Sequence, residues 1–263
     1  MDLIHHLTWT YALAGLLVSF MVGFTGVGGG SLMTPLLVLV FHIHPAAAVG
    51  TDLFYAGATR IVGAAVHGVR RTVDWAIVTR LAAGSVPAAA ITVAAMAHFH
   101  VRTAAGSHGV ITTMLGVSLI LTGLAILLRR IILAFMARRM GEVGQRTKTI
   151  STVVLGAALG VLVSISSVGA GAIGVTVLLL LYPALPASKL VGSDIAHAVP
   201  LTLLAGFGYW LMGSVDFALL ASLLVGSIPG IIAGSLLSSR APDSVLRPIL
   251  ASTLALVGGR LFF

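Results

Sequence analysis

The chain has 263 residues, of which 58% are hydrophobic and only 8% are charged, and its mean hydropathy is +1.11. A soluble domain carries roughly 25% charged residues, so this composition excludes an ordinary soluble protein and indicates an integral membrane protein. The formal net charge of +8 does not indicate nucleic-acid binding, because the basic residues cluster at the ends of apolar runs and in one loop, as membrane topology signals do.

Apolar runs of about 20 residues recur along the chain, and each is long enough to cross a hydrocarbon core roughly 30 Å thick. Their length, without the alternation of barrel strands, predicts an all-α polytopic bundle. The first run lacks the basic start and the cleavage site of a secretory signal, so we expect it to stay as a membrane segment. In chain order we expect a broken segment at 8–43, spans at 46–66, 75–97 and 109–128, a linker at 129–149, a second broken segment at 150–182, and spans at 187–210, 217–237 and 245–262.

The second half of the chain repeats the first. Residues 26–56, GVGGGSLMTPLLVLVFHIHPAAAVGTDLFYA, align with residues 167–198, SVGAGAIGVTVLLLLYPALPASKLVGSDIAHA. The register continues through VDW and VDF and through GSVP and GSIP, with an offset of 141 residues before Gly50 and 142 from there on. The repeat predicts two homologous halves, at 1–128 and 150–263, joined by the basic linker 129–149.

The basic residues favour one of two arrangements of these halves. If each broken segment is a hairpin that returns to its own side of the membrane, the second half is inverted; if it crosses once, the halves are parallel. The linker region 129–149 holds six of the 15 Lys and Arg residues, and the inverted arrangement leaves only Arg102 and Arg260 outside. The positive-inside rule therefore predicts inverted repeats, a cytoplasmic linker and external termini.

Glycine-rich stretches interrupt the first apolar segment of each half. A helix broken at membrane depth has unpaired backbone groups, which are tolerated only inside protein or beside a water-filled cavity. Matched breaks in two halves indicate a transport site, because half-helix N-termini attract anions; a close-packing glycine face without a ligand is the alternative. A nucleotide P-loop is excluded, since it needs a Lys and a preceding strand. The predicted substrate-binding residues are Thr25, Gly26, Gly28, Gly29, Gly30, Ser31, Ser166, Ser167, Gly169 and Gly171.

Two acids lie at equivalent positions in the repeat. Asp52 and Asp194 each follow a proline by about seven residues, which places them about 10 Å along a membrane helix. An acid at that depth indicates proton or cation coupling. The alternative is a helix restart, in which a glycine ends one helix and the Asp favours the N-terminus of the next. His197 follows Asp194 by three residues, on the same helical face, and adds a group that can exchange protons.

The other polar residues have simpler interpretations. Arg60 is either a counter-charge for an anion or for Asp52, or a cation whose long side chain reaches the membrane interface. Asp74 and Asp216 each follow a turn and precede an aromatic residue, so we expect them to cap helices at the interface. The chain has no cysteine and no HExxH-like spacing of its histidines, so we predict no metal site and no cofactor.

Several paired motifs together resemble the TauE/SafE family of sulfite exporters. They are the GxGGGxxxxPLL and GAGxxG breaks, the VGTD and VGSD segments, the VDW and VDF starts, and the two GS(V/I)P blocks. The resemblance covers nearly the whole chain. It implies a bundle of two homologous halves that transports sulfite, sulfonates or related small sulfur-containing or organic anions. The family's glycine motif falls on Gly26, Gly28, Gly29, Gly30 and Pro35, with a degenerate copy at Gly169 and Gly171 in which Ala170 and Thr176 differ.

The sequence therefore predicts a secondary transporter of the inner (plasma) membrane. We expect it to move a small anion such as sulfite or a sulfonate by alternating access of its two halves, with Asp52 and Asp194 available for proton coupling. Its expected partners are the anionic substrate and the lipid bilayer; the sequence sets no oligomeric state and allows a homodimer. Alternatives are an anion channel, a transporter of a non-sulfur organic anion and a subunit of a larger assembly. An intramembrane enzyme lacks a supporting catalytic context, so we expect no enzyme.

Overall fold

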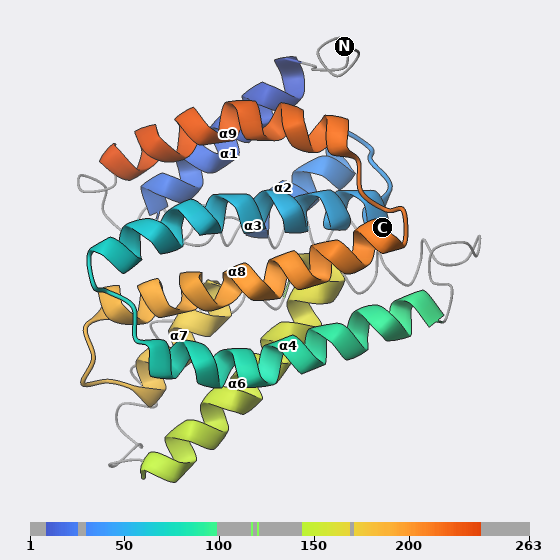
Figure 1. Cartoon of the computed structure of the whole chain (residues 1–263). Helices are drawn as coiled ribbons and strands as arrows, with labels where there is room; N and C mark the ends of the chain where they lie inside the picture. Colours follow the sequence, from blue (N-terminus) through green and yellow to red (C-terminus); the bar gives the residue numbers. More distant parts are fainter. Residues whose placement is uncertain are drawn as a thin grey trace.

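A computed structural model of the chain describes residues 9–25, 30–98, 117, 120, 144–168 and 171–237. Every element in these residues is a helix, which confirms the all-α class, and the helices form one layered bundle (Figure 1). The predicted span 245–262, the span 109–128 apart from two residues, and the linker before residue 144 lie outside the described residues. The helices are α1 (Trp9–Thr25), α2 (Gly30–Leu39), α3 (Pro45–Val69), α4 (Trp75–His98), α6 (Gln145–Ser166), α7 (Ala172–Leu181), α8 (Ala187–Leu211) and α9 (Phe217–Leu237).

The apolar helices fit a polytopic membrane protein. Among the described residues, α4, α6 and α8 are long and apolar enough to cross a membrane, and shorter apolar stretches lie at Trp9–Met21 in α1 and Phe217–Ala233 in α9. The two interfacial acids cap helices as predicted. Asp74 Oδ1 accepts a hydrogen bond from the Ala76 backbone N–H at 3.1 Å, and Asp216 Oδ1 accepts one from Leu219 at 2.9 Å.

The second glycine-rich stretch breaks a helix, as the sequence predicts, whereas residues 26–29 of the first stretch lie outside the described residues. α1 ends at Thr25 and α2 begins at Gly30, while α6 ends at Ser166 and α7 begins at Ala172. At the second break Ser167 has a φ of 58° and Gly171 a φ of 98° with ψ of −61°. A glycine adopts the latter conformation without steric cost because it has no Cβ. The chain can therefore reverse its direction between α6 and α7.

Each broken segment folds back on itself as a hairpin. In the second half, the hydroxyls of Thr152 and Tyr182 form a hydrogen bond of 2.9 Å that joins the first turns of α6 to the end of α7. The equivalent residues of the first half are Tyr11 and Phe41, and their rings pack with centroids 4.8 Å apart. Both contacts bring the end of the short helix back to the start of the long one. This is the hairpin arrangement, one of the two that the sequence leaves open.

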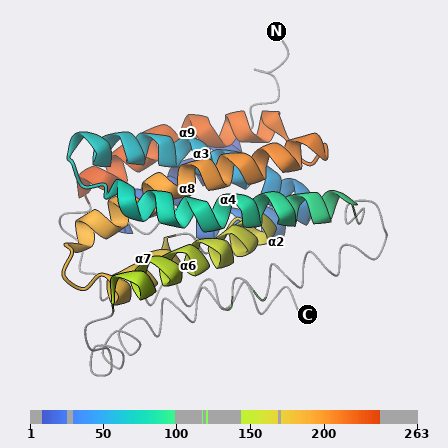
Figure 2. The same ribbon diagram turned by 60° about the horizontal axis from the view of Figure 1, so that its bottom comes forward.

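The two halves pack by exchanging helices. α1 of the first half lies along α9 of the second, and α6 of the second half lies along α4 of the first (Figures 1 and 2). Equivalent glycines allow both contacts. A Cβ added at Gly84 would lie 2.0 Å from the Val153 carbonyl oxygen, and one added at Gly226 would lie 1.7 Å from that of Ala12. The helix backbones touch at these points because no side chain separates them.

The equivalent helices α3 and α8 run in opposite directions through the centre of the bundle (Figure 1). A Cβ at Gly50, near the start of α3, would lie 2.4 Å from the Ser214 carbonyl oxygen just beyond the end of α8. A Cβ at Gly192, near the start of α8, would lie 2.2 Å from the Thr72 carbonyl oxygen just beyond the end of α3. The orientation of the two halves relative to a bilayer stays a prediction.

Repeat-equivalent hydrogen bonds join the turns to this central pair. The Asp74 backbone N–H donates to Ser193 Oγ at 2.8 Å, and the Asp216 backbone N–H donates to Thr51 Oγ1 at 3.1 Å. Each bond crosses from one half to the other. The start of α4 is therefore fixed to α8, and the start of α9 to α3.

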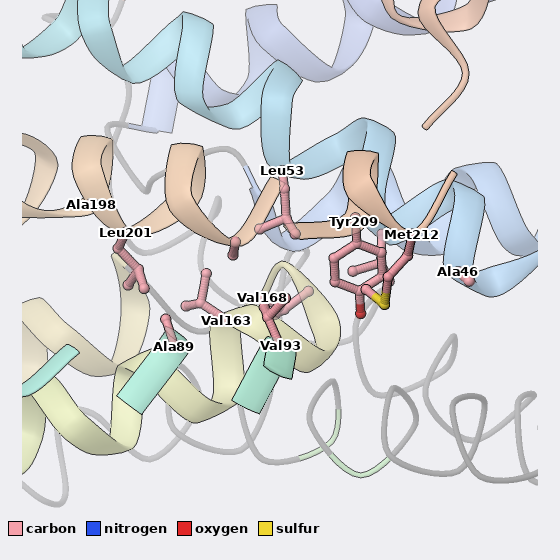
Figure 3. Packing of buried hydrophobic residues seen from close by; sticks show 12 residues of the cluster. Ala46, Leu53, Ala89, Val93, Val163, Val168, Ala198, Leu201, Tyr209 and Met212 are labelled. Carbon is pink, nitrogen blue, oxygen red and sulfur yellow. The ribbon is translucent and has the colours of Figure 1, made fainter. Parts of the chain in front are cut away.

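The tip of the second hairpin lies in the hydrophobic core. Val168, directly after Ser167, is fully buried and belongs to a cluster that draws on several helices (Figure 3). The cluster includes Leu53 of α3, Val93 of α4 and Leu201 of α8. The break between α6 and α7 is thus held at the centre of the molecule, where the buried polar residues of α3 and α8 also lie.

Inverted repeats place the ends of α3 and α8 on opposite sides of a membrane. Val69 and Leu211 are the last residues of these helices, are equivalent in the repeat, and are 87% and 69% exposed. Because the chain has no cysteine, Val69→Cys and Leu211→Cys each provide a single thiol. In sealed vesicles of one orientation, a membrane-impermeant maleimide should label only one of the two variants before the membrane is opened. Labelling of both from the same side would contradict the inverted arrangement.

Candidate functional site

Four ionisable side chains that the sequence singles out are buried together at the α3–α8 contact. Asp52, Asp194 and His197 are fully buried, and Arg60 is only 5% exposed. Asp52 and Arg60 lie on α3, whereas Asp194 and His197 lie on α8. Ionised groups removed from water are costly unless they are paired or hydrogen-bonded, so this cluster is the candidate functional site.

The glycines of α3 show how the two helices align. A Cβ at Gly57 would lie 2.7 Å from the Leu203 side chain, and a Cβ at Gly63 would lie 3.3 Å from Ile195. Arg60 lies midway between these glycines and therefore faces the part of α8 that carries Asp194 and His197. Asp52 lies eight residues earlier, about 12 Å along the helix at 1.5 Å per residue.

The Asp52 carboxylate lies between the two hairpins. Its Oδ2 accepts hydrogen bonds from the Thr34 backbone N–H at 3.2 Å and from the Thr34 hydroxyl in α2. The Ser167 side chain at the tip of the second hairpin lies close to Asp52 on another side. Asp52 Oδ1 has no hydrogen-bond partner, and neither has Ser167 Oγ. Asp52 therefore contacts the short helix of its own half and the helix break of the other.

The Asp194 carboxylate lies against the first turn of α7. The Gly171 backbone N–H, directly before that helix, lies close to this carboxylate. A Cβ at Gly174 would lie 2.2 Å from Asp194 Oδ1, so only a glycine leaves room for the carboxylate at this position. Asp194 Oδ1 has no hydrogen-bond partner. The negative charge of Asp194 thus lies at the positive end of the α7 dipole.

These positions contradict one of the two interpretations of the acids. α3 runs unbroken through Asp52 and α8 runs unbroken through Asp194, so the predicted helix restart at Gly50 and Gly192 is wrong. The neighbouring helices pack tightly against those glycines, which explains why glycine is present without a break. Each acid instead faces the N-terminal part of the short helix in its own half, α2 for Asp52 and α7 for Asp194.

Arg60 is a buried cation with free donors. Its Nη1 and Nη2 have no hydrogen-bond partner, although Asp194 and Asp52 are close enough to act on its charge. Within the part of the chain that the structure describes, the ion-pair distance is met by Lys189 and Asp74, at 3.7 Å, and not by Arg60. Because the guanidinium is buried, the interpretation that it reaches the membrane interface is wrong. Its role as a counter-charge stays open.

His197 is held by a residue of the first half. Its Nε2 lies 2.8 Å from Ser85 Oγ in α4, and its Nδ1 has no partner. The equivalent of His197 is Tyr55, whose hydroxyl hydrogen-bonds to Ser19, and Ser19 Oγ donates to Ser227 Oγ at 2.7 Å. Sequence reasoning missed these hydroxyls, although the GSVP and GSIP blocks contain Ser85 and Ser227. The repeat aligns Tyr55 with His197 and could have indicated their common role.

The predicted substrate-binding residues have different outcomes. Gly26, Gly28, Gly29 and Gly169 lie outside the described residues, and of Thr25, Gly30 and Ser31 only the backbone is described, at the ends of α1 and α2. Ser166 Oγ donates to the Leu162 carbonyl oxygen at 2.8 Å, inside α6. Ser167 and Gly171 lie beside the two acids. Binding of an anion by these residues stays a prediction.

The family model described as sulfite exporter TauE/SafE matches residues 11–261. The chain belongs to the TauE/SafE family. It is 37% identical over 256 residues to the probable membrane transporter protein YjnA of Bacillus subtilis (strain 168), an alignment that covers 95% of this chain and 97% of that protein. It is 29% identical over 253 residues to the probable membrane transporter protein YdhB of the same strain, and this alignment covers 94% of this chain and 97% of that protein. No solved structure matches the chain.

Family membership identifies the chain as a membrane transporter and not an enzyme, as expected from the sequence. In this TauE/SafE transporter the buried cluster of α3 and α8 lies beside the second helix break and beside Thr34 of α2. No group of three or more His, Asp and Glu side chains within the described segments could hold a metal ion. The chemistry of the cluster is therefore that of two carboxylates, one guanidinium, one imidazole and several hydroxyls.

Gly174→Ala should destabilise the fold, because its Cβ would lie 2.2 Å from Asp194 Oδ1. Overpacking of this kind costs about 1–3 kcal/mol, so the detergent-solubilised variant should unfold several degrees below wild type. Gly63→Ala is the matched control at the same α3–α8 contact, since its Cβ would only approach a flexible methyl group of Ile195 at 3.3 Å. The Gly174→Ala effect should shrink in an Asp194→Ala background; equal effects in both backgrounds would contradict the contact.

Proposed function

We propose that this TauE/SafE transporter moves a small anion, a sulfur oxyanion such as sulfite or a sulfonate, across the inner (plasma) membrane. The observation that carries the proposal is Arg60, a buried guanidinium with two unpartnered nitrogens. Guanidinium groups bind oxyanions through two parallel hydrogen bonds, and an unpaired buried charge is costly. An oxyanion bound to Nη1 and Nη2 would remove that cost. The description of the matched family as a sulfite exporter supports a sulfur oxyanion.

The arrangement of the two halves supports transport by alternating access. Each half contributes one hairpin and one acid to the same central region, and the halves contact each other through equivalent glycines and hydrogen bonds. A rocking movement of one half against the other would open this region to one side at a time. Export of an anion is favoured by an inside-negative potential, at about 2.3 kcal/mol per charge per 100 mV. We place the linker 129–149 in the cytoplasm.

Proton coupling through Asp52 and Asp194 is the second part of the proposal. Each carboxylate has one oxygen without a partner, in a position that water does not reach. A proton on either oxygen would remove the cost of a buried negative charge. Protonation and anion binding at one cluster would then influence each other, as coupled transport requires.

Arg60→Gln should abolish saturable sulfite flux into proteoliposomes, because the variant loses the counter-charge for the anion. Arg60→Lys should retain a small part of it, since an ammonium keeps the charge but loses the paired geometry. Arg80→Gln is the control, because Arg80 lies in the apolar helix α4 and donates to the Tyr182 hydroxyl at 3.2 Å, outside the cluster. Wild-type flux in Arg60→Gln would contradict the proposal. Wild-type flux without saturation or counterflow would favour a channel.

The double variant Asp52→Asn and Asp194→Asn should transport the anion without dependence on an imposed pH gradient, because it has no carboxylate to protonate in the cluster. The measurement is sulfite flux with and without that gradient in proteoliposomes. Asp74→Asn and Asp216→Asn, at the interfacial helix caps, should keep the dependence of wild type. Proton coupling through the two buried acids would be disproved by unchanged flux and unchanged pH dependence in the double variant.

A further inference from the structure

We propose that the Asp194 carboxylate occupies the binding position of the transported anion, and that the anion displaces it from the first turn of α7 while Asp194 takes up one proton from water. This inference rests on the proposed function, because it assigns a place to the anion of that function. It adds a mechanism of coupling: the carboxylate and the substrate exchange at one site.

The position of Asp194 is that of a bound anion. The helix α7 has 10 residues, and its N-terminal end faces the carboxylate. Gly174 leaves the space that the carboxylate fills, and the Gly171 backbone N–H lies close to it. Free backbone N–H groups and the helix dipole make such an end an anion site. The glycine-rich break therefore builds a site for an anion, and a side chain of the protein fills it.

The same site has more donors than Asp194 uses. Arg60 faces the Asp194 segment of α8 and is only 5% exposed. Neither Nη1 nor Nη2 of its guanidinium has a hydrogen-bond partner. Asp194 Oδ1 has no partner either. The Asp194 carboxylate is attached to α8, and it can lie at the N-terminal end of α7 without forming a hydrogen bond to the Arg60 guanidinium. An oxyanion with three or four oxygens is not attached to a helix and could bind the N-terminal end of α7 and the Arg60 guanidinium together.

The charges of the cluster require a proton when the anion enters. The two carboxylates of Asp52 and Asp194 and the guanidinium of Arg60 leave one excess negative charge when His197 is neutral. Adding a substrate anion would raise the excess to two or more in a region without water, which is strongly unfavourable. Protonation of the displaced Asp194 returns the cluster to one excess negative charge when the anion is monovalent. The proton comes from water, and it becomes bound to a carboxylate oxygen.

Other charged groups around Asp194 are accounted for on each packed element. On α3 these are Arg60, with Asp52 on its far side, and His67, whose Nδ1 would lie 3.0 Å from a Cβ at Gly192. On α4 Asp74 pairs with Lys189 of α8, outside the cluster. The helix α7 carries no titratable residue, and the charged residues of α6 lie in its first turn, far from the break. The remaining groups are His197 on α8 itself and the hydroxyl of Ser85 that binds it.

Binding of methanesulfonate to the purified full-length protein tests the inference, since this anion keeps a single charge over the relevant pH range. For wild type, calorimetric titrations in buffers of different ionisation enthalpy should show uptake of up to one proton per anion. The dissociation constant should rise by up to about tenfold per pH unit between the pH at which Asp194 titrates in the free protein and the higher pH at which it titrates in the complex. Asp194→Asn should bind the anion more tightly and without pH dependence, because its neutral amide competes less for α7. Asp216→Asn, at the cap of α9, should behave like wild type.

The outcomes separate this inference from the proposed function. If wild type binds methanesulfonate and sulfite without proton uptake, or if Asp194→Asn binds no more tightly and keeps the pH dependence, the displacement is overturned while an anion site remains. If wild type binds no sulfur oxyanion, the proposed substrate class falls and this inference falls with it. Should Asp194→Asn fail to fold, Asp52→Asn replaces it: proton uptake that persists in this variant supports Asp194 as the acceptor, and loss of the uptake overturns the inference.

Discussion

α3 and α8 cross the centre of the bundle in opposite directions and hold two carboxylates, a guanidinium and an imidazole away from water. Such groups need partners, and the rest of the fold supplies some of them. α7 turns its N-terminal end toward Asp194, Thr34 of α2 donates to Asp52, and α4 provides the serine that holds His197. The helix breaks are therefore part of the electrostatics of this central pair, because an unbroken helix could not present backbone donors to a buried acid.

The two halves have the same architecture but different side chains at equivalent positions in and around the buried cluster. Tyr55 in the first half is His197 in the second, and Arg60 aligns with Thr202. Met33 fills the place in α2 that Gly174 leaves open in α7 for Asp194. A symmetric scaffold thus carries an asymmetric cluster, with the cation on one side only. A single anion position beside Arg60 fits that asymmetry better than two equal half-sites do.

Composition, apolar run length and the repeat were sufficient to predict the helical class, the second helix break and the position of the acids along α3 and α8, because these depend on local sequence. The sequence could not decide what Asp52 and Asp194 do, since a glycine before an acid fits both a helix restart and a close contact with another helix. The sequence also could not predict that Arg60 is buried, because its exposure depends on which helix packs against α3. The bond between Ser19 and Ser227 joins residues 208 positions apart, a pairing that no local pattern specifies.

The exchange of helices between the halves also bears on how the protein is made. α1 is synthesised first, yet the helix that it packs against, α9, is the last that the structure describes. Until α9 has been synthesised, the glycine-lined face of α1 lacks the helix against which it packs. In the same way, α4 lacks its packing partner until α6 has been synthesised. The first half on its own would therefore be an assembly intermediate with two open faces, and the completed bundle would form only when the second half closes both.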